Sequence, residues 1–160
     1  MVMIDKDPNS PETAGDDGLP YQLTLEVRDT CLCLHVQRAA RALARRFDEV
    51  LRPLGLTNGQ YSLLMSLNRP APATMRQVST VLAMDRTTLT AALKPLERRG
   101  LVEVTVDPDD RRSRRLALTA EGRSVLAEAV PLWRRTHAAI ERQLAGGDAD
   151  RLRADLLSLS

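Results

Sequence analysis

The order of elements can be worked out from residues 74–118, TMRQVSTVLAMDRTTLTAALKPLERRGLVEVTVDPDDRRSRRLAL. Apolar residues recur at three- and four-residue steps in 75–83 and again in 85–99, which predicts two helices separated by a single residue. From residue 101 the apolar period shortens to alternation, and a polar turn divides two short strands, 101–106 and 114–118. The pattern predicts a helix-turn-helix followed by a β-hairpin, or wing.

The second helix of this pair has two chemically different faces. Its core face carries the apolar residues Leu89, Ala92, Leu93 and Leu96. The opposite face carries short side chains, Thr87, Thr88, Thr90 and Ala91, and also Lys94. Threonine is a poor helix former, so three threonines at one exposed helix start favour a function over a face that only meets solvent. In a DNA major groove, hydroxyls bond base edges or phosphates and methyl groups contact thymine, so we expect this helix to read DNA.

The tip of the predicted hairpin is rich in charge. Its arginines are Arg111, Arg112, Arg114 and Arg115, and its aspartates are Asp107, Asp109 and Asp110. An arginine at such a tip can enter the narrow minor groove, where the potential is most negative. A nearby aspartate can hold the guanidinium in a bidentate pair and set its direction. The alternative is a charged turn that only aids solubility.

Four more helices are expected outside this region. Their ranges are 31–52, 57–67, 119–144 and 148–157. Thr57 with Gln60 and Thr74 with Gln77 form capping-box patterns, and Thr119 can cap the helix that follows the hairpin. The chain is therefore predicted to be mainly α with a small β-hairpin wing, an α+β winged helix with six helices. Pro95 and Pro131 should bend the helices that contain them, because proline removes a backbone hydrogen bond.

Composition excludes several classes of protein. The 160 residues fit one domain, and 43% hydrophobic with 28% charged residues is typical of a globular chain. Aromatic residues make up only 2%, which argues against β-sandwiches and against nucleic-acid binding by stacked aromatics. Residues 1–30 carry two basic and seven acidic side chains, whereas 31–160 carry 21 basic and 14 acidic ones. The basic part is either a solvated surface or a site for a polyanion.

The N-terminal region is predicted to be a flexible acidic arm, residues 1–22, ahead of a single domain, residues 23–160. No apolar run reaches the ~18 to 20 residues of a membrane span, and no secretory signal is recognised, so a cytoplasmic protein without membrane contact is expected. Cys31 and Cys33 are too few and too close for a zinc site. No phosphate loop, nucleophile elbow or metal cluster is present, so we expect no enzyme activity, no metal and no cofactor.

Residues 31 to about 145 resemble the MarR family of bacterial winged-helix transcription regulators. The resemblance rests on LTNGQY at 56–61, TLT at 88–90, LERRGLV at 96–102 and DPDDRRSRRLALTAEG at 107–122. It implies an obligate homodimer whose first and last helices, within 23–56 and 119–160, interlock. It also implies a DNA-binding lobe at 57–118, which we call the winged lobe, and a double-stranded, pseudo-palindromic operator as partner.

The resemblance also assigns roles to individual residues. Arg112 would be the wing-tip arginine and Asp110 its orienting partner. The other positions that face DNA would be Asp85, Arg86, Thr88, Thr90 and Lys94, and Thr87 lies on the same exposed face. The implied mechanism is repression by occupancy of the operator, relieved when an effector changes the spacing of the two lobes. The alternative is a winged helix that binds another protein and not DNA.

Two kinds of effector are compatible with the sequence. Cys33 lies 28 residues before Tyr61, a spacing that resembles the peroxide sensors of the family, although Phe47 and Asn58 stand where those sensors have tyrosines. Two residues apart on one helix, Cys31 and Cys33 would point about 200° apart, which disfavours an intrachain disulfide. The other effector is a small aromatic or carboxylate ligand. Its candidate contacts are His35, Arg38, Tyr61 and Met65.

Overall fold

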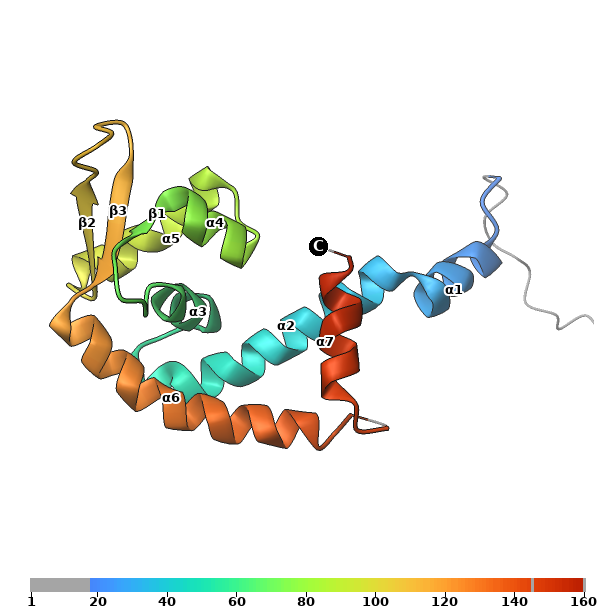
Figure 1. Cartoon of the computed structure of the whole chain (residues 1–160). Helices are drawn as coiled ribbons and strands as arrows, with labels where there is room; N and C mark the ends of the chain where they lie inside the picture. The colour runs from blue at the N-terminus through green and yellow to red at the C-terminus, as the bar shows by residue number, and fades with distance from the viewer. Residues whose placement is uncertain (1–17, 145, 160) are drawn as a thin grey trace, which may run out of the picture. The chain divides into compact units, whose positions relative to one another are not determined.

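The computed structural model describes residues 18–144 and 146–159 (Figure 1). The order of the elements is α1 (Tyr21–Thr30), α2 (Leu32–Leu51), the 3-10 turn η1 (Arg52–Leu54), α3 (Asn58–Ser66), β1 (Ala73–Thr74), α4 (Met75–Leu82), α5 (Arg86–Arg98), β2 (Val102–Val106), β3 (Arg114–Leu118), α6 (Ala120–Glu141) and α7 (Ala149–Leu157). Contacts divide the chain into two compact units, Met1–Arg41 and Ala42–Ser160. Within the described ranges, no helix combines the length and the apolar character that a membrane crossing requires.

The predicted mainly α fold with a small wing is confirmed, but the described residues form seven α-helices where six were expected. The additional one is α1. Its apolar residues Tyr21, Leu23, Leu25 and Val27 alternate along the chain as in a strand, and α1 buries none of its residues. Residues 1–17 of the predicted arm lie outside the described residues, whereas residues 21 and 22 are already helical. Periodicity missed α1 because its apolar side chains do not gather on one helix face.

The core of the second unit is built from leucine. The largest fully buried side chains are Leu51, Leu63, Leu64, Leu89, Leu96, Leu116 and Val78. They come from the end of α2, from α3, α4 and α5, and from β3. Each such side chain contributes roughly 1.5–3 kcal/mol by leaving water. The core therefore joins the helix-turn-helix and the wing in one packed body.

The sheet has three antiparallel strands in the order β1-β3-β2, so the predicted hairpin gains a strand. β2 pairs with β3 from Val102↔Leu118 to Val106↔Arg114, and β1 adds Ala73↔Leu116 and Thr74↔Arg115. A strand at 73–74 was not predicted, because two residues are too few to show alternation. Thr74 ends β1 and also caps α4, so the sheet leads into that helix without a linker.

The predicted helix starts are confirmed. Thr57 with Gln60 and Thr74 with Gln77 form complete capping boxes, and Thr119 accepts from the Gly122 N–H at 2.9 Å. Both helices that contain an internal proline, α5 with Pro95 and α6 with Pro131, continue through it. Figure 1 shows that α6 bends along its length.

Two close contacts position α5 and α6. A Cβ at Gly122 would lie 2.0 Å from the Leu101 carbonyl oxygen, so only glycine lets α6 approach the base of the wing. At the C-terminal end of α5, the Arg99 guanidinium donates to the carbonyl oxygens of Gly55 at 2.5 Å and Leu54 at 3.1 Å. Gly55 has a φ of 63° and leaves room for that guanidinium.

Candidate nucleic-acid interface and effector pocket

The two faces predicted for α5 are confirmed. Leu89, Leu93 and Leu96 are at most 4% exposed, and Ala92 is half-buried. The residues predicted to face DNA are all exposed: Asp85, Arg86, Thr87, Thr88, Thr90 and Lys94. The arrangement leaves a continuous polar face available along the first three turns of the helix.

Two of the three threonine hydroxyls on this face are already engaged as donors. The Thr88 hydroxyl donates to Asp85 at 2.5 Å, and the Thr90 hydroxyl donates to the Arg86 carbonyl oxygen at 2.7 Å. Asp85 also accepts from the Thr88 N–H, and the hydroxyl followed by the N–H lowers the pKa of this carboxyl. A hydroxyl whose proton is engaged presents lone pairs and a methyl group outward. Such a surface suits amino groups or the thymine methyl better than phosphate oxygens, which only accept.

Asp110 shapes the wing turn through the main chain. It accepts from the Arg112 N–H at 2.9 Å and from the Ser113 hydroxyl at 2.8 Å. The Arg112 N–H is the largest cause of the lowered pKa of Asp110, and the Ser113 hydroxyl is the next. Asp110 thus holds the backbone at Arg112, while neither of these two bonds involves the Arg112 guanidinium, so its role in orienting that guanidinium stays a prediction. Arg112 itself is exposed.

Asp107, not Asp110, holds a guanidinium in the wing. Arg115 Nε lies 2.6 Å from Asp107 Oδ2, and Asp107 is only 4% exposed. The Arg115 hydrogen bond is the largest cause of the lowered pKa of Asp107, and the Asp109 N–H adds to it. From the sequence, Asp107 was expected only to be one of the acids of the wing tip. The sequence feature that indicates the pair is the place of Asp107 directly after β2, because the partner strand β3 begins with Arg114 and Arg115.

A second site lies in the same unit, between α3 and α6. This cavity of about 650 Å³ is lined by Tyr61 and Met65, two of the predicted effector contacts, and by Trp133 and Arg134. The rings of Tyr61 and Trp133 stack with centroids 6.4 Å apart, and Trp133 stacks on His137 at 4.7 Å. Burial raises the pKa of Tyr61. Trp133 and Arg134 were not predicted as site residues, because their place beside Tyr61 of α3 appears only once α3 and α6 pack together.

The other three effector candidates lie in the unit Met1–Arg41. Cys33 is exposed, and its sulfur accepts from Gln37 Nε2 at 3.1 Å. His35 Nδ1 lies 2.9 Å from the Cys31 carbonyl oxygen, and Arg38 is exposed. Cys31 has φ −71° and ψ 106°, an extended conformation, so it separates α1 from α2. The two cysteines are therefore not on one continuous helix. The prediction that helix geometry turns their side chains about 200° apart, which disfavoured an intrachain disulfide, is wrong because Cys31 is not helical.

Metal ligands do not gather in the described part of the chain. Across residues 18–144 and 146–159, no group of three or more His, Cys, Asp and Glu side chains could hold a metal ion.

Comparison with known proteins supports the architecture. A model of the MarR family matches residues 54–113. A crystal structure of the M. tuberculosis transcriptional regulator MosR in complex with DNA is 41% identical, with a TM-score of 0.74 over 81% of this chain and 92% of that one. The transcriptional repressor CouR of Rhodococcus jostii, bound to a DNA duplex, is 30% identical, with a TM-score of 0.74 over 83% of this chain and 94% of that one.

Curated relatives match over a smaller part of their length. The organic hydroperoxide resistance transcriptional regulator of Bacillus subtilis is 29% identical over 101 residues, 63% of this chain and 69% of the relative. For two other regulators, from Clostridioides difficile and B. subtilis, the alignment spans only 55% and 62% of the relative's length. The similarity to MosR and CouR, by contrast, extends over 92% and 94% of those structures. The chain belongs to the MarR family of transcriptional regulators.

Proposed function

We propose that this chain is a homodimeric, sequence-specific regulator that binds double-stranded DNA, a repressor relieved by an effector. The observation that carries the proposal is the exposed polar face of α5 beside a wing rich in arginine, both held on one leucine core. The MosR and CouR structures with DNA support it. A regulator of this kind acts on the chromosome, so we place it in the cytoplasm and assign it no catalytic role.

Dimerisation is supported by apolar side chains that each unit leaves uncovered. In the unit Met1–Arg41, Tyr21, Val27 and Leu32 are between 48% and 71% exposed. In the other unit, Leu152 and Leu156 lie one turn apart on α7 and are 43% and 42% exposed. Exposed large apolar side chains are typical of surfaces that pack against a partner. We propose that 23–56 and 119–160 form the dimer and that 57–118 binds DNA.

In this proposal, α5 enters the major groove of a pseudo-palindromic operator. Asp85, Arg86, Thr87, Thr88, Thr90 and Lys94 would form the contacting face. Because their protons are engaged, Thr88 and Thr90 would accept from base amino groups or contact thymine methyls. Arg112 would reach the minor groove from a turn that Asp110 holds in shape.

The test is selection of binding sites from a randomised duplex library, followed by fluorescence anisotropy at several salt concentrations. Arg112→Ala should weaken binding to all sequences and lower the slope of log affinity against log salt by about 1. Thr88→Val should instead change the preferred base at one position of each half-site. The proposed function is wrong if the wild-type chain selects no sequence and shows no binding to DNA. That is the outcome expected of a winged helix that binds another protein and not DNA.

For the effector, the cavity beside Trp133 favours a flat, mainly apolar molecule that carries an anionic group. Its volume lies within the roughly 300–1,000 Å³ of small-molecule sites, and Arg134 supplies a cation beside two aromatic rings. A structure of CouR, 25% identical to this chain, shows that relative bound to p-coumaroyl-CoA. Screening such compounds for release of the selected DNA, with Trp133→Ala as the insensitive variant, tests this part.

An oxidant is the second effector candidate, because Cys33 is exposed and a curated relative is an organic hydroperoxide regulator. Organic peroxide should then release the selected DNA from the wild-type chain, and a thiol should restore binding. Cys33→Ser should abolish that response. A response retained by Cys33→Ser would exclude Cys33 as the sensor.

A further inference from the structure

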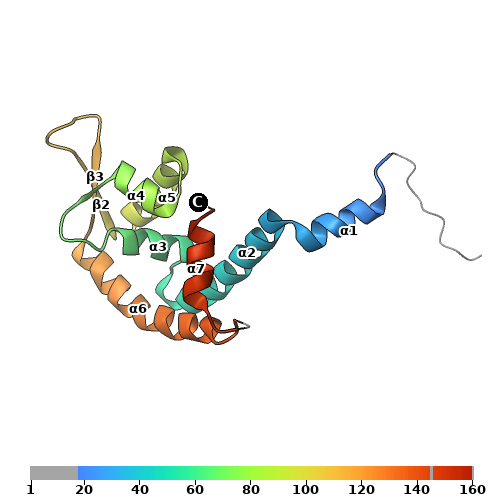
Figure 2. The same ribbon diagram turned by 45° about the vertical axis from the view of Figure 1, so that its right-hand side comes forward.

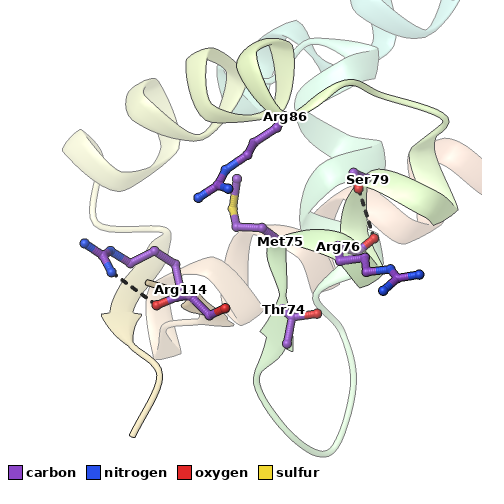
Figure 3. Close-up of a pocket in the computed structure, with 7 residues that line it drawn as sticks. Thr74, Met75, Arg76, Ser79, Arg86 and Arg114 are labelled. Carbon is purple, nitrogen blue, oxygen red and sulfur yellow. Dashed lines mark hydrogen bonds between the residues drawn. The ribbon is translucent and has the colours of Figure 1, made fainter. Parts of the chain in front are cut away.

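A small cationic pocket lies where the wing meets the first turns of α4 and α5 (Figure 3). Its volume is about 240 Å³, below the range of roughly 300–1,000 Å³ that takes small organic ligands. Its lining has three arginines, Arg76, Arg86 and Arg114, and the hydroxyl residues Thr74, Ser79 and Ser113, but neither Asp nor Glu. The size and charge of the pocket suit one compact anion.

The fold holds these cations through the main chain. Strand pairing places Thr74 opposite Arg115, so the first turn of α4 lies beside the strand residue that follows Arg114. Arg86 is the first residue of α5. Figure 3 shows the Arg86 and Arg114 side chains on the same side of Met75, while Arg76 extends to its other side. The N-terminal ends of two helices, which carry partial positive charge, thus meet the start of β3, next to the wing turn, at this pocket.

Arg114 differs from its neighbour Arg115 in how its charge is compensated. Arg115 pairs with the nearly buried carboxylate of Asp107. The Arg114 guanidinium donates through one nitrogen, to the carbonyl oxygens of Arg111 at 3.2 Å and Ser113 at 3.1 Å. Carbonyl oxygens orient a guanidinium but do not neutralise it, so Arg114 keeps its full charge at the edge of the pocket.

We propose that the pocket binds one phosphate of the DNA backbone in each half-site, with Arg86 and Arg114 as its principal contacts. The inference rests on the proposed function and adds Arg114 to the DNA contacts. The groove-reading face of α5 begins at Arg86, so a phosphate held here sits between the major-groove contacts and the wing. Such a contact is independent of sequence and sets the position of α5 along the duplex. A free phosphate ion has the same chemistry, and the experiments below separate the two sources.

The first experiment measures the salt dependence of binding to both the selected duplex and a random-sequence duplex. Arg114→Gln should weaken binding to the two duplexes by the same factor and lower the salt slope by about 1 per protomer. Arg86→Gln should do the same, and the double variant should lose less than the sum, because both side chains serve one phosphate. Arg98→Gln, at the opposite end of α5, is the matched control and should leave the slope unchanged.

The second experiment replaces single phosphates of the selected duplex by uncharged methylphosphonates. At one position per half-site, the substitution should weaken DNA binding by the wild-type chain. The same substitution should not weaken DNA binding by Arg114→Gln any further. Inorganic phosphate at constant ionic strength should not shift the thermal unfolding of the DNA-free chain. A shift that Arg114→Gln removes, without a sensitive position in the duplex, would make this a site for a free anion and overturn the proposal.

The two proposals fail in different ways. Unchanged salt slopes in folded Arg114→Gln and Arg86→Gln, with a wild-type chain that binds DNA steeply with salt, would overturn the phosphate site and leave the proposed function intact. A wild-type chain that does not bind DNA would overturn the proposed function itself. Circular dichroism of each variant confirms that it is folded.

Discussion

The winged lobe and the outer helices bury their residues to very different degrees. Between Tyr61 and Leu118, every helix and every strand of the winged lobe contributes a buried residue. By contrast, α1 and α7, which are labelled in Figures 1 and 2, bury none of their residues, and α2 buries only Phe47 and Leu51, close to its end. The winged lobe is therefore packed throughout, with the end of α2 and the first half of α6 completing its core, whereas α1, α7 and most of α2 leave apolar side chains exposed.

The largest effect should come from breaking the closest contact of the packed body. Gly122→Ala would place a Cβ 2.0 Å from the Leu101 carbonyl oxygen, so α6 must move away from the wing. We expect a loss of about 4 kcal/mol or more in the free energy of unfolding. Urea denaturation measures it.

Gly59→Ala is the matched control for that substitution. Gly59 lies in the first turn of α3, and its nearest neighbour would be 4.0 Å from the new Cβ. Alanine should be neutral or stabilise by about 0.5–1 kcal/mol there. Equal effects at the two glycines would mean that the contact with Leu101 does not limit packing.

The next effect tests the outer helices. Leu156→Asp on α7 should raise the dimer dissociation constant at least tenfold, because burying a leucine contributes roughly 1.5–3 kcal/mol. Sedimentation equilibrium measures the constant. Ala154→Asp, two residues away and on the other side of α7, should leave it unchanged. A dimer that is equally stable in both variants would remove α7 from the interface.

A smaller effect sharpens the role of local sequence in the winged lobe. Thr74→Ala removes one half of the capping box that joins β1 to α4, and it should cost about 1 kcal/mol of stability. Thr80→Ala, exposed near the end of the same helix, should change stability by only a few tenths of that amount. Thermal unfolding of the two variants side by side gives the comparison.

The smallest expected effect is on the pH dependence of stability in the acid range. Arg115 lowers the pKa of Asp107 in the folded chain, so the folded state binds the proton less readily than the unfolded state. The resulting stability is complete above the ordinary Asp pKa of about 3.9 and is lost as the pH falls through the lowered value. Asp107→Asn should flatten that part of the pH dependence, measured by urea denaturation between neutral pH and strong acid. An unchanged acid limb would show that the pair does not contribute.

Most of the winged lobe could be predicted because its signals are local. Leucines at helix spacing, the cap residues Thr57, Thr74 and Asp85, and the alternation after Gly100 all lie within a few residues of what they determine. The missing parts depend on contacts between distant segments or on patterns too short to read. The strand at 73–74 exists only because β3 lies beside it, and α1 carries a strand-like alternation in a helical segment.

The candidate sites follow the same rule. The exposed face of α5 is a property of one helix, so its residues could be named from spacing alone. The partner of Arg115 and the place of Trp133 beside Tyr61 depend on strand register and on helix packing. Sequence spacing therefore found the residues that face outward and missed those that face one another.

The bonds from Arg99 to the Leu54 and Gly55 carbonyl oxygens limit how α5 can move. The bonds connect Arg99, the residue that follows α5, to the turn that follows α2. If α5 moved along its own axis, both charge-assisted bonds would break. These bonds therefore oppose translation of this helix, while rotation of the lobe as one body leaves them intact. Effector binding would then act on DNA binding by rotating the lobe. Operators with different half-site spacing should therefore differ in how strongly the effector lowers their affinity for the protein.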